Sequence, residues 1–198
     1  TATFTLYLYS SAGAQIYNQS HSVGARSRLQ IDLKALNTSA ATGKITYTET
    51  GLVFRVSYES IGGGVAEFRT IDALGSNIGF CFSDFSTLVQ WKGAAIANMG
   101  TTNASVTLYA LGGSAQGSGG SILANHTETI VPKAKLVGNQ FNWSWLGGLD
   151  LSQIESIVAV AGSSSLCGIA ISGDTALSRL LFTPAAAVSN FNPESETW

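Results

Sequence analysis

The stretch WKGAAIANMGTTNASVTLYAL, residues 91–111, contains two apolar segments separated by a polar one. In the second segment, Val106 and Leu108 alternate with polar or amphipathic side chains. A period of two is typical of a strand with one buried face. The Asn, Gly and Thr residues at 98–103 favour a tight turn. This stretch therefore predicts two consecutive β-strands joined by a turn.

A similar strand pattern, TFTLYLY, opens the chain at residues 3–9. Further matches follow in order along the chain, and such self-similarity predicts an internal repeat. We predict two tandem antiparallel β-sandwiches, over residues 1–75 and 76–187, followed by a tail over residues 188–198. The repeat argues against a viral jelly roll, which is the rival fold. The further matches align residues 25–29 with 131–136, Ile45 with Ile157, and residues 68–73 with 181–185.

Local patterns predict several further elements. Alternation over residues 26–33 predicts a strand between core and solvent. We also expect a strand over residues 140–145, and a helical turn capped by Asp150. Two hairpins are predicted, one joining 44–48 to 52–58 and the other joining 154–161 to 166–172.

The composition limits the classes of partner. Charged residues make up 11% of the chain and the net charge is −2, without a basic cluster, so we expect no nucleic acid partner. No apolar run reaches the ~20 residues of a membrane helix, so we expect no membrane insertion. The low charge and positive mean hydropathy indicate that another molecule covers part of the surface.

The chain has two cysteines, Cys81 and Cys167, whose spacing matches neither a zinc site nor a haem site. Two interpretations stand: a disulfide formed in an oxidising compartment, or two free thiols packed as small apolar groups. The two histidines, His21 and His126, have no accompanying Gly-x-Ser-x-Gly motif. We therefore predict no catalytic residue, no metal site, no cofactor and no enzyme activity.

Aromatic side chains recur at every second position in Phe141, Trp143 and Trp145. Such a row either belongs to a core or stacks on sugar rings. Five Asn-x-Ser/Thr sequons are glycosylation candidates if the host modifies them. Of these, Asn142 lies beside two tryptophans and is the least accessible. The other four are Asn18, Asn37, Asn103 and Asn125.

The segments WKGAAIANMG (91–100), ASVTLY (104–109), VPKAKL (131–136), LDLS (149–152) and CGIAISG (167–173) resemble one known kind of module. It is the repeated immunoglobulin-like β-sandwich module of large bacterial cell-surface and secreted proteins. The resemblance covers about residues 76–187 well and 1–75 in part, with Met99 where proline is usual. It implies an all-β fold of two tandem immunoglobulin-like antiparallel β-sandwiches, an extracellular or cell-surface location, and a scaffold or adhesive role without catalytic residues.

The two predicted units differ in one respect: residues 78–97 have no counterpart in the first unit, which would therefore expose a sheet edge. Natural proteins avoid long open edges. We hypothesise that another chain completes this edge by β-strand addition, with the tail as a candidate donor. Repeated head to tail, that contact builds a filament. Alternatively, the strand is simply absent, or the chain is a fragment of a longer repeat protein.

These observations predict a non-enzymatic extracellular structural or adhesive protein whose partner is protein, through self-association or a larger surface assembly. A carbohydrate-binding module that holds a glycan with Phe141, Trp143 and Trp145 is the alternative. A secreted hydrolase accessory domain is the second alternative.

Overall fold

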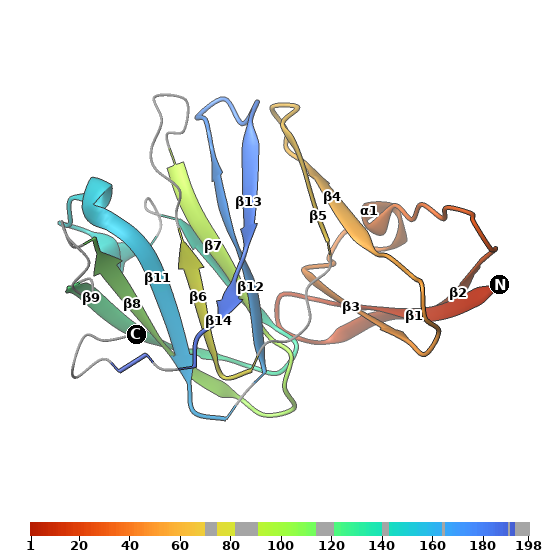
Figure 1. Ribbon diagram of the computed structural model, residues 1–198, viewed down its shortest axis with the longest axis horizontal. Coiled ribbons are helices and arrows are strands. Elements are labelled where there is room, and N and C mark those ends of the chain that lie inside the picture. The colour runs from red at the N-terminus through yellow and green to blue at the C-terminus, as the bar shows by residue number, and fades with distance from the viewer. Residues whose placement is uncertain are drawn as a thin grey trace.

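The computed structural model describes residues 1–69, 75–81, 91–113, 121–139, 143–163, 165–189 and 191–192. It confirms the predicted all-β class, because strands that pair in antiparallel sheets dominate the chain (Figure 1). The helices among the described residues are single turns, and none of them is long and apolar enough to cross a membrane.

The N-terminal part of the chain, which we call the first unit, contains the elements from β1 to β5. Strands β1 (Ala2–Tyr9), β2 (Gln15–Val23) and β3 (Thr42–Tyr47) form a three-stranded sheet in the order β2-β1-β3. Strands β4 (Arg55–Glu59) and β5 (Val65–Arg69) form a separate hairpin. Phe4, Leu6 and Leu8 alternate along β1 and form the buried centre of this unit.

The second unit contains the elements from β6 to β14, in two sheets that face each other (Figure 1). Their facing sides bury an apolar core that includes Phe80, Ile96 and Leu108. One sheet has the order β10 (Lys135–Asn139), β7 (Trp91–Asn98), β12 (Leu166–Gly173), β13 (Leu180–Pro184), and the other has the order β14 (Ala186–Ala187), β6 (Asn77–Cys81), β11 (Ile154–Ala161), β8 (Ala104–Gly112), β9 (Ile122–Ile130).

Three short helical turns complete the described structure. The α-helical turn α1 (Leu33–Leu36) begins after Asp32, whose carboxylate accepts hydrogen bonds from the backbone N–H groups of Lys34 and Ala35. Asp150 caps the 3₁₀ turn Leu151–Gln153 in the same way, by accepting from Ser152, as the sequence predicted. The third is a 3₁₀ turn, Ser144–Leu146.

The structure corrects four local predictions. The predicted strands β7 and β8 and the turn between them are confirmed, and this turn crosses from one sheet to the other. The first correction is that β11 and β12 also lie in opposite sheets and form no hairpin. Strand β3 pairs with β1 and not with β4. Residues 26–32 form no strand, and the predicted strand over 140–145 is wrong at its described end, where Ser144–Leu146 is a 3₁₀ turn.

The first unit repeats the strand register of the second. Ala2 pairs with Val23 as Ala104 pairs with Ile130. The same irregularity interrupts both ladders, after Leu8 in β1 and after its counterpart in β8. Leu6 lies opposite Ile45 in β3 as Leu108 lies opposite Ala159 in β11, so Ile45 corresponds to Ala159 and not to Ile157. The predicted repeat is therefore confirmed for β1, β2 and β3, with this shift in the alignment.

The turns after β2 and β9 also correspond. Arg26 and Lys133 have φ angles of 57° and 62°, a left-handed conformation that non-glycine residues rarely adopt. In each turn the next residue closes a hydrogen bond of 3.2 Å, from Ser27 N to Gly24 O and from Ala134 N to Val131 O. Arg26 therefore occupies the position of Lys133, and Leu29 that of Leu136.

Within the part of the chain that the structure describes, the two units contact each other at the β4–β5 hairpin and near the β1–β2 turn (Figure 1). At the tip of the β4–β5 hairpin, Gly64 N donates to Leu177 O at 2.9 Å, and the Ser60 hydroxyl donates to the same carbonyl. Near the β1–β2 turn, the Thr42 hydroxyl donates to Lys133 O at 2.7 Å. These contacts join the first unit to both ends of the β10-β7-β12-β13 sheet.

Candidate functional site

Strand β7 occupies the centre of one sheet of the second unit, between β10 and β12. Ala97 pairs with Lys135 on one side and with Cys167 on the other, and both neighbours run antiparallel to β7. Ala94 and Ile96 point into the core and are almost completely buried. The strand thus supplies backbone partners to both neighbours and apolar side chains to the core.

Asn98 ends this strand and fixes it to the adjacent turn. Its side-chain amide donates to Ile130 O at 2.9 Å and to Thr102 O at 2.8 Å, and its side-chain oxygen accepts from Gly100 N at 2.9 Å. Its backbone N–H donates to Ala134 O at 3.1 Å, and its carbonyl accepts from Lys133 N at 2.8 Å. Asn98 is 0% exposed, and every polar group of this residue has a partner.

The first unit has the two neighbours of such a strand, without a strand between them in the described chain. Residues 28–31 follow Arg26 as β10 follows Lys133. Leu52 follows β3 at the same distance along the chain as Leu166 follows β11. No ladder joins residues 28–31 to β4, which pairs with β5 alone among the described strands. We call residues 28–31 and the segment of residues 52–59, which includes β4, the open edges.

The backbone of the open edges confirms this gap. Within the part of the chain that the structure describes, the N–H and C=O groups of residues 28–31 and 52–54 form no hydrogen bond. Side chains along these segments are also more exposed than a completed sheet would leave them, with Leu29 at 45% and Val53 at 65%. A sequence that alternates as residues 26–33 do shows which side faces the core, but the backbone forms a strand only beside a partner.

The core of the first unit is partly rebuilt around this gap. Phe54 stands where Gly168 stands in the second unit, and there the ring of Phe80 from β6 lies against Gly168. In the first unit the Phe54 ring itself packs on Phe4, with centroids 5.1 Å apart in an edge-to-face arrangement. Phe54 thus replaces the ring that β6 provides, whereas nothing among the described residues replaces β7.

Equivalent cationic residues of the two units differ in burial. Burial lowers the pKa of Lys135, and burial followed by repulsion from Lys44 lowers the pKa of Lys133. Their counterparts Arg26 and Arg28 are exposed. The cationic side chains beside the open edges therefore face solvent.

Two residues of the predicted sugar platform, Trp143 and Trp145, are described, and they do not form an exposed row. Trp143 is 8% exposed and belongs to the core, where its indole nitrogen packs against Gly138. Trp145 lies half-buried on a 3₁₀ turn and stacks on His126, with ring centroids 6.0 Å apart. Its indole N–H is buried, with no hydrogen-bond partner among the described residues. Phe141 lies outside the described residues.

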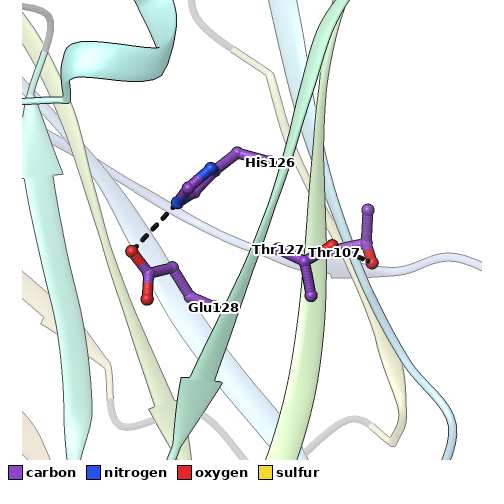
Figure 2. A network of polar contacts seen from close by, with 4 residues as sticks. All are labelled: Thr107, His126, Thr127 and Glu128. Carbon is purple, nitrogen blue, oxygen red and sulfur yellow. Dashed lines mark hydrogen bonds and ion pairs between the residues drawn. The ribbon is translucent and has the colours of Figure 1, made fainter.

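A catalytic histidine needs both a carboxylate and a hydroxyl beside it, and Figure 2 shows the surroundings of His126. Its Nε2 lies 2.9 Å from Glu128 Oε1 on one face of β9, whereas the hydroxyl pair of Thr107 and Thr127, 3.0 Å apart, lies on the other face. His21 contacts the Tyr17 hydroxyl at 3.2 Å, and no carboxylate among the described residues bonds to it. Neither histidine is thus bonded to both a carboxylate and a hydroxyl in the described structure.

Cys167 is a free cysteine, so the predicted disulfide is not formed in this structure; the side chain of Cys81 lies outside the described part. Leu166 and Gly168 face the core, so alternation places Cys167 on the outer face of its sheet, from which it cannot reach across to β6. Burial raises the pKa of the Cys167 thiol to about 11. No group of three or more metal-binding side chains occurs in the described ranges.

Three of the four favoured sequon asparagines are exposed, namely Asn18, Asn103 and Asn125. Asn37 is half-buried, and its side-chain oxygen accepts a hydrogen bond from Ser39 N at 2.9 Å. Asn142 lies outside the described residues. Asn18 and Asn125 hold equivalent places in the repeat, since each pairs with a tyrosine of the neighbouring strand.

Comparison of the chain with protein-family models, with curated proteins and with solved structures gave no match.

Proposed function

We propose that this chain is a non-enzymatic extracellular structural or adhesive β-sandwich protein that assembles with other protein chains by β-strand addition. The observation that carries the proposal is the pair of open edges in the first unit. An unpaired edge is a template for a further strand, because its N–H and C=O groups point at the partner that would complete the sheet. Strand addition to one unit of each chain is a heterologous contact, and its repetition gives a filament.

The tail, residues 188–198, is a candidate donor of the strand that would complete the first unit. Ala186–Ala187 pair with β6, Val188 N donates to Asn77 O at 3.2 Å, and the Phe191 ring lies 5.2 Å from Tyr109. These contacts place the beginning of the tail on its own second unit. Donation by the tail would therefore use residues 193–198, which lie outside the described residues, or would release these contacts.

The proposal is tested by measuring the mass of the full chain by light scattering over a range of concentrations, with negative-stain microscopy of the largest species. We expect species larger than a monomer in the wild type. Leu29 corresponds to Leu136, whose backbone N–H faces β7 in the second unit. Leu29→Pro removes that N–H from the open edge and should reduce assembly, whereas Leu29→Met keeps the N–H and should assemble normally. A wild-type chain that stays monomeric at every concentration would refute assembly by strand addition.

A further inference from the structure

We propose that the open edges take up a single β-strand, carried by another polypeptide, with the side-chain pattern of residues 93–98: a buried small residue, a buried aliphatic residue two positions later, and asparagine after two more. The inference rests on strand addition as the proposed function, and it specifies the place, the register and the chemistry of the incoming strand. The second unit shows the same two neighbours with such a strand, β7, already between them.

The repeat fixes the register. In the second unit, Ile96 lies between Leu136 and Gly168, and the residues that correspond to these in the first unit are Leu29 and Phe54. The incoming aliphatic side chain would therefore lie between Leu29 and Phe54, above the buried face of β1. Both neighbours of β7 run antiparallel to it, so the incoming strand runs antiparallel to β4 and to residues 28–31.

The strand should end in asparagine, because in the second unit the side-chain amide of Asn98 donates to Ile130 O, whose counterpart in the first unit is Val23 O.

The backbone of this last residue also joins the strand to the turn. In the second unit, the backbone of Asn98 bonds to Lys133 N and Ala134 O, which lie in the left-handed turn. In the first unit, the corresponding groups, Arg26 N and Ser27 O, have no recorded partner among the described residues. The turn is already in the conformation that receives the asparagine, since the φ angles of Arg26 and Lys133 agree within a few degrees.

The outward-facing positions distinguish the expected strand from β7 itself. The position equivalent to Ala97 lies beside Arg28 and Val53, and the position equivalent to Ala95 lies beside Gln30 and Arg55. Among the described residues, Arg55 forms an ion pair of 3.5 Å with Glu67, and both side chains are exposed. We therefore expect acidic side chains at these outward positions to strengthen binding, with a gain that falls as salt is added.

Backbone pairing should contribute more to the binding free energy of the incoming strand than the burial of exposed core side chains. Phe4, Leu6 and Leu8 are already between 1% and 7% exposed, because Phe54 and its neighbours close over them. What remains to be gained is the pairing of two open edges and the burial of Leu29 and Val53. Binding should therefore be modest for a free peptide and much stronger when a short connection raises its effective concentration to the millimolar range.

The decisive experiment uses two forms of the same strand. In the first, a copy of residues 91–102 is fused directly before Thr1, which holds the place of Asn103 in the repeat, so that the copy arrives through the same connection as β7. In the second, a synthetic peptide of residues 91–102 is added to the unmodified chain. Hydrogen exchange at residues 28–31 and in β4 is the measurement, because new ladder bonds slow exchange at those amides.

We expect the fused copy to slow exchange at the open edges at least tenfold, and the peptide to slow it in proportion to its concentration. A fused copy carrying I96D and N98A, and a scrambled peptide, should do neither. If neither the fused copy nor the peptide protects these amides, the proposal fails. If the fused copy protects them and the peptide does not, even at a concentration of about 1 mM that matches the effective concentration of a tethered strand, supply by another chain is refuted.

The test also separates this inference from the proposed function. A wild-type chain that assembles, and continues to assemble with the fused copy in place, uses some other surface, which refutes the inference but not assembly. A wild-type chain that stays monomeric while the peptide protects the open edges refutes assembly but not the site. Loss of assembly on fusion supports both.

Discussion

Replacing Asn98 by alanine should destabilise the second unit more than any surface change. The substitution removes three side-chain hydrogen bonds of 2.8–2.9 Å and leaves Ile130 O, in the core, without its amide partner. At about 1 kcal/mol for each bond, with a further penalty for an unsatisfied buried acceptor, the free energy of unfolding should fall by roughly 3 kcal/mol, within about 2–5. Asn98→Asp should be at least as damaging, because a carboxylate cannot donate to the two carbonyls.

Urea denaturation followed by tryptophan fluorescence measures this loss, since Trp91, Trp143 and Trp145 lie in the second unit and residues 1–75 contain no tryptophan. Asn103→Ala is the matched control: it lies in the same turn, is exposed, and has no recorded side-chain bond among the described residues, so it should change the unfolding free energy by less than about 0.5 kcal/mol. A loss below about 1 kcal/mol for Asn98→Ala, or an equal loss for the control, would refute the role assigned to this residue.

Two further predictions concern the same unit. A Cβ atom on Gly138 would lie 1.7 Å from the Trp143 indole nitrogen, so Gly138→Ala should lower the free energy of unfolding by roughly 1–3 kcal/mol. Gly162→Ala is the control, because Gly162 has open space around it. Equal stability of the two variants in a thermal or urea melt would contradict the packing. The second concerns the thiol of Cys167, whose pKa is raised to about 11, in a Cys81→Ser variant. At pH 8 this thiol should alkylate roughly a hundredfold more slowly than a free cysteine, and the rate should rise about tenfold for each pH unit above 8. Alkylation as fast as in the urea-unfolded chain would contradict the burial of Cys167.

The repeat could be predicted from the sequence because its strands each bury one face, and this leaves an alternating pattern of apolar residues. Alternation along β1 and β8 indicated the buried side correctly, and the match between Thr5-Leu-Tyr and Thr107-Leu-Tyr predicted the register that the structure shows. The helical turn capped by Asp150 was also predicted correctly, because a side-chain cap is a local interaction that the sequence around it specifies.

Pairing between distant segments was the part that sequence did not predict. Residues 44–48 and 52–58 are close along the chain, but β3 pairs with β1, forming the sheet over the buried face of Phe4 and Leu6. Residues 26–33 alternate as a strand would, yet alternation carries no information about whether a neighbour is present to accept backbone bonds. The candidate site was therefore predictable as an incomplete unit, whereas its position between residues 28–31 and β4 required the structure.

The double attachment between the units has a mechanical consequence. With one contact, the first unit could rotate about that point. Hydrogen bonds at the hairpin tip and near the β1–β2 turn together oppose any rotation that would break either of these two contacts. A methyl group on Gly13 would lie 2.1 Å from Pro132 O, so the second attachment also depends on the absence of a side chain at that position. A force that pulls the two units apart would therefore have to break both attachments.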